Sequence, residues 1–533
     1  MVVMLGQSVT ILLEVREPMP LYNPQLDDEV LFDASVPIQG VNNSLPPSAI
    51  DRTASEDAEN RLTQRDGLNR PRPGIIRLKK SSPTGSLDSI HHVGTGVFLA
   101  NDATAWYKFD NRANTLSSAA GGPAYAPGAQ VYSALANDVL YFSSGTTLNK
   151  YSVAAGFGSV ALPANGPTAK YPIWAVERLI YAYQNTLIVS DALNPEVFDV
   201  ATGSVTIDPI ASDVITGQCL WQTQRLAVFR NGATYVIETG PGLNVPDWAI
   251  NRVSGTIGCR CHGTIVQTET DVIFLSETGR GVYRCSQAPA SDQQGIWRPA
   301  SADVQGYIDR INWSACDNAR ATFWNDLYML SVPLDNFTYN NFCLIYSVSL
   351  DKWQGTWCFD IGGTDVAVRD FARDRTDLNY TVLLAATRDG IISRFTYPVE
   401  RRYYDQNIDN SQQVYKSFLR SRSFTFGENI NQIRPHSARF QFLESDDAVD
   451  ITVIADRATE LIKRNTPTSN SLLSLPIPRF SFDLDREGFM NVPIGLLGVG
   501  ICTELQFLLE GTGNWSLFQI KVAAFESMPL LST

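Results

Sequence analysis

The sequence predicts a mainly β protein whose central part is a β-propeller of about six or seven blades. Two observations predict this fold. Short apolar strand cores return along residues 81–400 at intervals of 40 to 55 residues, and a period of roughly 40 to 50 residues is typical of propeller blades. Gly-containing pairs follow several of these cores, where tight hairpin turns are expected. We expect an N-terminal arm and helix before the propeller and an antiparallel β-sandwich after it.

Residues 1–80 form the predicted arm. Residues 8–15 look like a strand that could complete the C-terminal sandwich, and residues 69–74 contain two prolines, which favour an extended or turning segment. Between them we expect a helix that begins at an N-cap, Ser48, and ends near Gly67. One face of this helix carries an apolar residue at every fourth position: Ile50, Ala54, Ala58 and Leu62.

The charges of the arm change sign along the chain. Residues 1–60 hold two bases and ten acids, whereas residues 61–80 hold seven bases and only Asp66 as an acid, which gives local balances of −8 and +6. We expect the bases to pair with an acidic partner or with the arm itself rather than with nucleic acid, because aromatic residues are not interleaved among them. The candidate contacts to another subunit or to an adaptor are Arg61, Arg65, Arg70 and Arg77.

Residues 81–400 form the predicted propeller. Its strand cores are centred on Phe98, Tyr141, Tyr181, Val228, Phe274, Met329 and Leu384. Four hairpin turns are expected at Ser144-Gly145, Asn231-Gly232, Thr278-Gly279 and Asp389-Gly390, where Gly would supply a positive φ. A stacked array of β-sandwiches would also give many short strands, but its turns should return every 8 to 12 residues.

Residues 401–533 form the predicted sandwich, because the strands there become longer and alternate in polarity. They lie at residues 414–426, 437–443, 449–454, 480–484, 504–509 and 518–525.

Composition narrows the possible functions. The chain has 533 residues and a net charge of −13, which is unfavourable for a general binder of nucleic acid or anionic membranes. Eight cysteines without a Cys-x-x-Cys pair predict no disulfide framework and a reducing compartment of origin. No run of eighteen apolar residues predicts a membrane span.

The sequence contains no recognised catalytic motif, and we expect no catalytic residue, cofactor or metal. Cys259-Arg-Cys261-His262 is a possible metal-ligand cluster, but its spacing is unusual and packing explains it as well. Trp353 and Trp357 favour packing between blades over a sugar-stacking platform. A glycosidase would need a pair of carboxylates; the acids considered are Asp271, Glu277, Asp326 and Asp351.

Short motifs resemble those of the tail nozzle proteins of short-tailed bacteriophages, a group that includes packaged-DNA stabilisation proteins. The first set opens the propeller, the second is an Ile-Gly-Cys followed by a strand and a Gly, and the third is a strand and turn that end in Trp. The residues that carry the resemblance are Gly40, Asn60, Gly67, Arg72, Pro73, Gly74, Gly258, Cys259, Gly279 and Trp353.

The resemblance implies a non-enzymatic virion protein made in the cytoplasm of the bacterial host. It would form a homo-oligomeric ring, expected to be a hexamer, below the portal and its adaptor protein. The ring would extend the channel for double-stranded DNA, retain the packaged genome, and dock tail fibres or spikes and a plug or needle. An acidic lining would let DNA slide during ejection. The alternative is a propeller that binds or hydrolyses polysaccharide of the host surface.

Overall fold

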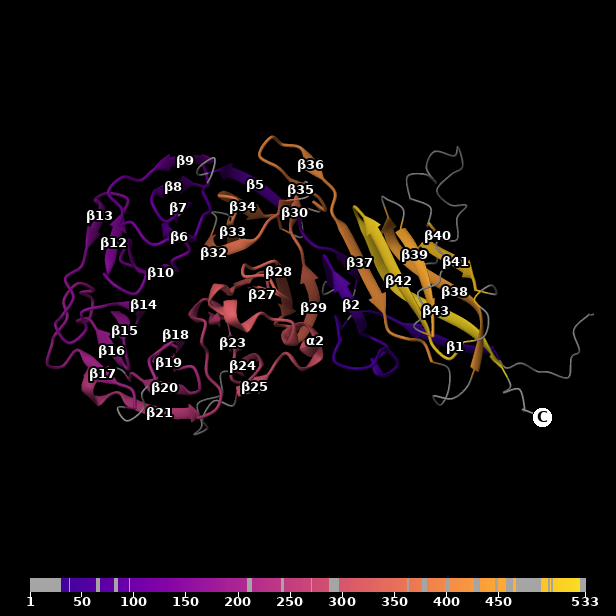
Figure 1. The fold of residues 1–533 in the computed structure, drawn as a ribbon, viewed down its shortest axis with the longest axis horizontal. Coiled ribbons are helices and arrows are strands. Elements are labelled where there is room, and N and C mark those ends of the chain that lie inside the picture. The colour runs from indigo at the N-terminus through magenta and orange to yellow at the C-terminus, as the bar shows by residue number, and fades with distance from the viewer. Residues whose placement is uncertain are drawn as a thin grey trace, which may run out of the picture.

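The computed structural model describes residues 30–527 except 38, 64–67, 81–84, 95, 209–212, 241–243, 270, 287–296, 362–363, 376–380, 398–399, 401, 426–431, 446–448, 457–463, 466–489, 497–498 and 500–501. Within this part the protein is mainly β, and its sheets form two bodies that share strands (Figure 1). A ring of sheets occupies one side of the molecule. A pair of packed sheets, formed mostly by residues after 415, occupies the other.

The ring has a β-propeller-like arrangement of four-stranded antiparallel sheets around a common centre (Figure 1). Seven such sheets are present in the described residues, and we number them ring sheets 1 to 7 in chain order. Ring sheet 1 consists of β6 (Ser89–Gly94), β7 (Val97–Asn101), β8 (Trp106–Asp110) and β9 (Thr115–Ser118), and ring sheet 2 of β10 (Tyr132–Ala136), β11 (Val139–Ser143), β12 (Asn149–Ser152) and β13 (Gly156–Ser159). Ring sheet 3 consists of β14 (Lys170–Ala175), β15 (Arg178–Tyr183), β16 (Thr186–Val189) and β17 (Ser204–Thr206), and ring sheet 4 of β18 (Gly217–Gln222), β19 (Arg225–Phe229), β20 (Thr234–Glu238) and β21 (Ala249–Ser254). Ring sheet 5 consists of β22 (Val266–Gln267), β23 (Asp271–Ser276), β24 (Gly281–Ser286) and β25 (Trp297–Pro299). Ring sheet 6 consists of β26 (Arg320–Trp324), β27 (Leu327–Val332), β28 (Phe342–Ser347) and β29 (Lys352–Trp357). Ring sheet 7 consists of β32 (Val368–Arg375), β33 (Thr381–Thr387), β34 (Ile391–Phe395) and β5 (Ile75–Lys80).

The ring is closed by a strand from the N-terminal part of the chain. The first strands of neighbouring ring sheets lie beside one another all the way round, including β32 beside β6. Neighbouring sheets also share hydrophobic cores, and between ring sheets 7 and 1 Leu384 packs in one cluster with Phe98. The fourth strand of ring sheet 7 is β5, which precedes ring sheet 1 in the sequence. Residues 75–80, which we expected in the arm, therefore belong to the ring.

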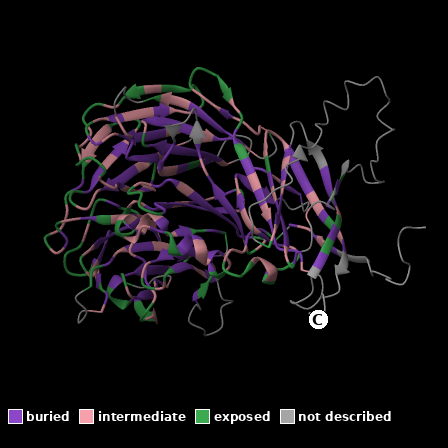
Figure 2. Cartoon of the chain, turned by 45° about the vertical axis from the view of Figure 1, so that its right-hand side comes forward, coloured by how far each residue is buried: buried purple, intermediate pink, exposed green. Residues whose placement is uncertain are grey.

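The predicted strand cores are confirmed as strands. Each of the seven lies in the second strand of its ring sheet, and these strands are buried along most of their length (Figure 2). All four predicted turns join the second strand to the third. Gly145 and Gly390 adopt the expected positive φ of 105° and 79°, whereas Gly232 and Gly279 do not. In the latter turn Arg280 takes the positive φ, at 47°.

The prediction of a helix over residues 48–67 is wrong. Residues 47–49 make a single 3-10 turn, and the chain then forms β2 (Ser55–Glu59) and β3 (Arg61–Thr63), with Asn60 at a φ of 57° between them. The four-residue apolar spacing is real, but β2 gains hydrogen-bonding partners on both edges, and tertiary pairing outweighs helix propensity. Gly67 and residues 8–15 lie outside the described residues. The described helical segments are η2 (Pro47–Ala49), η3 (Val245–Asp247), η4 (His262–Thr264), η5 (Ala302–Val304), α2 (Gln305–Asp309) and η6 (Trp313–Asn318).

The second body is a pair of sheets that enclose a large apolar core. Phe440, Phe507 and Trp515 are among its fully buried side chains. Predicted strand 480–484 lies outside the described residues, and the other five are confirmed as strands with shifted ends. The strands of this body and its connections are β1 (Val30–Ser35), β4 (Asn69–Pro71), β30 (Asp360–Ile361), β31 (Thr364–Asp365), β35 (Asp405–Gln406), β36 (Gln412–Gln413), β37 (Lys416–Ser421), β38 (Gln432–Ser445), β39 (Val449–Ala455), β40 (Arg464–Asn465), β41 (Met490–Gly495), β42 (Leu505–Thr512) and β43 (Trp515–Ser527).

Strand β2 joins the ring to this second body. It pairs in parallel with β29 of ring sheet 6, where Glu59 lies opposite Thr356, and antiparallel with β37, where Ala58 lies opposite Leu419. A single nine-stranded sheet therefore runs from ring sheet 6 into the second body. The strand β1 pairs with β43, so residues 30–35, rather than the predicted 8–15, are the described N-terminal residues that add to the C-terminal sheets.

Candidate functional site

Many of the motif residues meet where the ring joins the second body. We call this place the arginine junction and define it by Asn60, Arg61, Arg72, Asp405 and Tyr415. The side chains of Arg72 and Asp405 are fully buried and form a two-pronged ion pair, with Nη2–Oδ2 and Nη1–Oδ1 distances of 2.6 and 2.9 Å. Burial lowers the pKa of Arg72, but Asp405 outweighs this and raises the pKa above its usual value. The arginine therefore stays charged inside the protein.

Asn60 ties this ion pair to both bodies. Its side-chain oxygen accepts hydrogen bonds from Arg72 Nε at 2.9 Å and from the backbone N–H of Cys358 at 3.0 Å. Its side-chain nitrogen donates to the backbone oxygen of Lys416 in β37 at 2.8 Å. The positive φ of Asn60 makes these contacts possible, because Asn tolerates the left-handed region better than most residues.

Arg61 is the second buried arginine of the junction, and an aromatic ring and neutral oxygens surround its guanidinium. Its guanidinium lies over the ring of Trp515, 3.6 Å from the centroid, and donates to the backbone oxygen of Trp515 and to the side chain of Asn69. Burial lowers its pKa to about 9. These contacts fasten β3 to β43.

The expectation that four arginines contact partners is corrected for two of them. Arg61 is fully buried, and Arg77 pairs with Asp389 of ring sheet 7 with only 8% of its side chain exposed. Both cations are used inside the chain because the basic stretch forms strands with neighbours on either side. Arg70 is partly exposed in β4, and Arg65 lies outside the described residues.

Two of the motif glycines, Gly40 and Gly74, lie where two segments of the backbone pack directly against each other. An added Cβ at Gly40 would lie 1.9 Å from the backbone oxygen of Trp353, and one at Gly74 would lie 2.0 Å from that of Tyr404. Gly40 also has a φ of 79°. Pro73, between Arg72 and Gly74, is buried. The first and third motif sets therefore meet at the boundary of the two bodies.

The remaining motif residues lie elsewhere, between ring sheets 4 and 5. An added Cβ at Gly258 would lie 2.0 Å from the backbone oxygen of Arg230, and Cys259 is packed in the core that these two sheets share. Gly279 accepts a hydrogen bond from the hydroxyl of Tyr283. These residues fix the contact between two sheets.

Replacing Gly258 by Ala should destabilise the protein by about 1–3 kcal/mol, because backbone atoms within 2.6 Å of the new methyl group would have to move. Gly232 is the matched control: it lies in the neighbouring hairpin, and no atom lies within 4 Å of its added Cβ. Gly232→Ala should stay within about 0.5 kcal/mol of the wild type. Urea denaturation of the two variants tests this, and equal stabilities would contradict it.

A second group of polar and aromatic residues, most of them half-buried, lies at the centre of the ring. Tyr132 of β10 and Tyr171 of β14 contact the ring of His262, with centroid distances of 4.6 and 4.5 Å. The Arg320 guanidinium lies 5.3 Å from the centroid of Tyr132 and 3.6 Å from the carboxylate of Asp370. Burial raises the pKa of Asp370 to about 6, although Arg320 opposes the shift.

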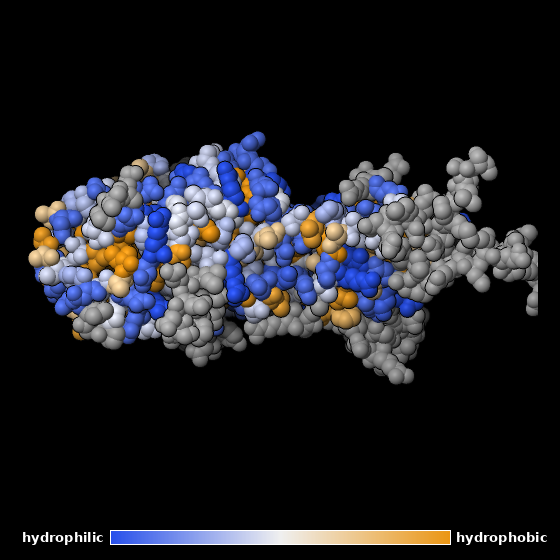
Figure 3. Space-filling view, turned by 90° about the horizontal axis from the view of Figure 1, so that it is seen from below, coloured by the Kyte–Doolittle hydropathy of each residue, from blue (hydrophilic) through white to orange (hydrophobic). Residues whose placement is uncertain are grey.

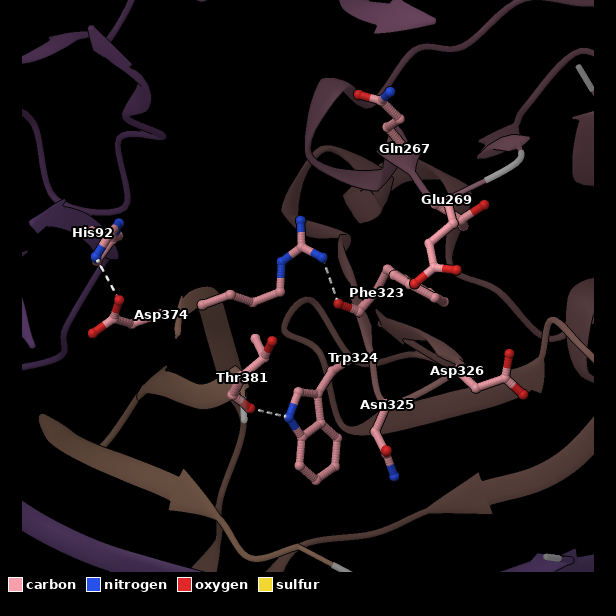
Figure 4. Close-up of a pocket in the computed structure, with 11 residues that line it drawn as sticks. His92, Gln267, Glu269, Phe323, Trp324, Asn325, Asp326, Asp374 and Thr381 are labelled. Atoms are coloured by element: carbon pink, nitrogen blue, oxygen red, sulfur yellow. Dashed lines mark hydrogen bonds and ion pairs between the residues drawn. The ribbon is translucent and has the colours of Figure 1, made fainter. Parts of the chain in front are cut away.

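At one end of the ring centre a cavity of about 820 Å³ opens to solvent (Figure 4). His92 and Asp374 face each other there at 3.0 Å, and the indole nitrogen of Trp324 donates to the backbone oxygen of Thr381. Asp326 accepts hydrogen bonds from Ser347 and from the backbone of Ser349, so it caps a turn as well as lining the cavity.

The other candidate acids and tryptophans have structural partners. Asp271 and Asp351 both pair with Arg284, and Glu277 pairs with Arg260. The side chains of Trp353 and Trp357 are buried on opposite faces of β29. They are therefore core residues and cannot stack on a sugar.

No three His, Cys, Asp or Glu side chains among the described residues are placed to hold a metal ion. In the described part of the chain, no helix has the length and apolar character needed to cross a membrane.

No protein-family model and no curated protein matches the chain. Solved structures similar to it include a streptogramin B lyase, with 10% sequence identity and a TM-score of 0.42, which covers 60% of this chain and 97% of its own. Another is a chain of the mitotic checkpoint complex, with 11% identity, a TM-score of 0.38, and coverage of 61% of this chain and 94% of its own. Likenesses at this level do not indicate an activity for this chain. The strand pairings define its fold.

Proposed function

We propose that this chain is a structural protomer of a phage tail nozzle. The observation that carries the proposal is that the nozzle-like motifs from two distant parts of the sequence meet at the boundary between the ring and the second body. Gly40, Asn60 and Arg72 come from the N-terminal part of the chain and Trp353 from ring sheet 6. Residues that hold two parts of the fold together favour a structural role, in which the protein transmits force, over a catalytic role.

In this proposal the seven ring sheets are the seven blades of a propeller, and the second body is a β-sandwich that includes β1. The N-terminal β5 supplies the fourth strand of the last blade, and its pairing covers an edge of β34 that would otherwise be open. The shared nine-stranded sheet then fixes the sandwich to blade 6.

The DNA channel would run between subunits rather than through the propeller. Tyr132, Tyr171 and His262 contact one another at the ring centre, which leaves no room for a DNA duplex. We therefore propose a ring of identical protomers, expected to be six, around a shared duct below the portal-adaptor protein. Fibres or spikes and a plug or needle would dock on its outer and distal surfaces.

The surface offers apolar contacts of the kind that such an assembly uses. Figure 3 shows apolar residues gathered on the ring side of the molecule. Leu193, Val197 and Val200, in the connection between β16 and β17, expose 66%, 45% and 56% of their surface. Exposed apolar groups of this kind mark interaction surfaces, and they support a function carried out by docking.

Electron microscopy of virions labelled with an antibody against the ring portion tests the proposal. We expect label confined to the distal end of a short tail. Label on lateral spikes, or particles without label, would contradict the nozzle assignment.

The cavity of about 820 Å³ supports one alternative, a propeller that binds or cleaves polysaccharide. Glu269, Asp326 and Asp374 line it, and a glycosidase needs two such carboxylates. Release of reducing sugar from host polysaccharide, lost in Glu269→Gln or Asp374→Asn, would favour this alternative. Wild-type protein that releases no sugar and does not bind the polysaccharide would exclude it.

A further inference from the structure

Two cysteines meet at the boundary of ring sheets 5 and 6. Cys261 immediately precedes η4, which leads to the inner strand β22, and Cys316 lies in η6, which leads to the inner strand β26. They occupy comparable places in successive ring sheets. Their sulfur atoms are 3.0 Å apart although 55 residues separate them in the sequence. The fold therefore holds two thiols from different sheets in direct contact.

The surroundings favour reaction between these two sulfurs over other pairings nearby. The Cys261 thiol also lies 2.8 Å from the backbone oxygen of Cys316, so the two segments are held together by more than the sulfur contact. Cys259, two residues earlier, instead directs its sulfur to the backbone oxygen of Cys261 and to the hydroxyl of Thr264. Cys261 thus has one sulfur neighbour at contact distance, that of Cys316, whereas the sulfur of Cys259 is directed to other partners.

A cavity that small molecules can enter reaches one of the two cysteines. Cys261 lines an open cavity of about 360 Å³ at the ring centre, together with Lys170, Tyr171 and Arg260. The residue itself is 3% exposed, whereas Cys316 is 1% exposed and does not line this cavity. A disulfide reagent would therefore reach Cys261 first, and Cys316 would act on the product.

We propose that Cys261 and Cys316 form an oxidation site that a small peptide disulfide, such as glutathione disulfide, converts into a bridge between ring sheets 5 and 6. The inference concerns the chain's own thiols and does not depend on the proposed nozzle function.

The reaction takes place in two exchanges. The Cys261 thiolate attacks one sulfur of glutathione disulfide, whose S–S bond breaks as the first glutathione leaves. The Cys316 thiolate then attacks the Cys261 sulfur of the mixed disulfide and releases the second glutathione. The protein loses two electrons and two protons, and one glutathione disulfide becomes two glutathione molecules.

The same surroundings predict that the reaction is slow near neutral pH. The hydrogen bond with Cys316 and burial raise the pKa of Cys261 well above its usual value, so little thiolate is present. The rate should therefore rise with pH.

Peptide mapping of the oxidised full-length chain tests the proposal. The wild type is incubated with glutathione disulfide at pH 8.5, remaining thiols are blocked with N-ethylmaleimide, and the chain is digested without reductant and analysed by mass spectrometry. We expect a linked peptide pair that contains Cys261 and Cys316 and separates after treatment with dithiothreitol. The bridge should raise Tm by about 4 °C relative to the reduced chain, because it closes a loop of this length.

Variants distinguish the two steps. In Cys316→Ser the first exchange should stop at a glutathione adduct on Cys261, with no linked peptide. Cys219→Ser is the control, since Cys219 is only partly buried and has no part in the pair, and it should form the bridge like the wild type. A wild-type map in which both thiols remain free, or in which Cys261 is linked to Cys259, would overturn the proposal whether or not the variants fold.

Discussion

Replacing Arg72 by Met should lower the free energy of unfolding by about 3–5 kcal/mol, the largest effect that we expect from a single substitution in this protein. The variant would leave Asp405 fully buried without its cation, and Asn60 would lose the hydrogen bond from Arg72. A buried carboxylate without a cation either stays charged in a medium of low polarity or takes up a proton, and each outcome costs free energy of folding. Since domains are stable by roughly 5–15 kcal/mol, such a loss would be easy to measure by urea denaturation.

Arg310→Met provides the matched control. Arg310 and Asp335 also form a two-pronged ion pair, through Nε and Nη2 at 2.9 Å each, but both side chains are 46% exposed. Exposed pairs contribute about 0–1 kcal/mol, because water competes for both charges. Arg72→Met and Arg310→Met should therefore differ by several kcal/mol, and equal losses would contradict a special role for the arginine junction.

A double substitution separates the charge from the packing. Arg72→Met combined with Asp405→Leu removes both buried charges and should be more stable than Arg72→Met alone, because no unpaired charge is left behind. If the double variant were less stable than the single one, the hydrogen bond that Asp405 accepts from the backbone N–H of Ile75 would outweigh the cost of the unpaired carboxylate.

The sequence was informative where strands are buried on both faces. The seven strand cores became visible because the second strand of each ring sheet has neighbours on either edge and packs against other sheets on both faces, which selects continuous apolar runs. The two-residue β22 and the partly exposed β13 offer no such run. The period of the cores thus predicted the ring, whereas a short first strand such as β22 and an exposed fourth strand such as β13 could not be predicted.

The helix prediction failed for a physical reason of the same kind. Strand β2 has its hydrogen-bonding partners in ring sheet 6 and in β37, about 300 and 360 residues further along the chain, as the pairings Glu59–Thr356 and Ala58–Leu419 show. A local pattern contains no information about such partners. Apolar residues at every fourth position therefore indicated a helix, although Ala58 and Leu62 are buried in strands.

The candidate site was predicted in part. The resemblance pointed to Asn60, Arg72 and Gly74, which do meet at the arginine junction. Their partner Asp405 lies 333 residues from Arg72 and follows no motif, so nothing in the sequence singled it out. At the ring centre, the sequence singled out His262 only as part of a possible metal-ligand cluster, and nothing in it indicated that His91 and His262 would both lie near Arg320.

Acidification should destabilise the protein through these two histidines. His91 is buried, and its ring nitrogens contact Ser89 Oγ at 2.8 Å and Ser133 Oγ at 3.0 Å. Burial first, and the nearby charge of Arg320 second, lower the pKa of both His91 and His262 to about 3. In the unfolded chain each histidine takes up a proton near pH 6.5. The stability that the neutral rings provide is therefore complete above pH 6.5 and is lost as the pH falls toward 3.

Asp370 acts in the opposite direction at the same place. Its pKa of about 6 lies above the ordinary value, so the folded state binds this proton more tightly than the unfolded state does, and acidification below pH 6 favours folding at this residue. The two histidine shifts are each larger than the aspartate shift, and the net effect of these three residues is a loss on the order of several kcal/mol between pH 6.5 and pH 4. We expect urea denaturation at pH 7, 6, 5 and 4 to show this decline.

His91→Asn identifies the source of the decline. Asn can keep a hydrogen bond to a serine but cannot take up a proton in this range, so the variant should be less stable than the wild type at pH 7 and should lose less stability on acidification. His436→Asn, at an exposed position of β38, should follow the wild-type curve. Parallel curves for the wild type and His91→Asn would mean that the ring centre opens before its histidines are protonated, and the acid sensitivity would then belong to the carboxylates.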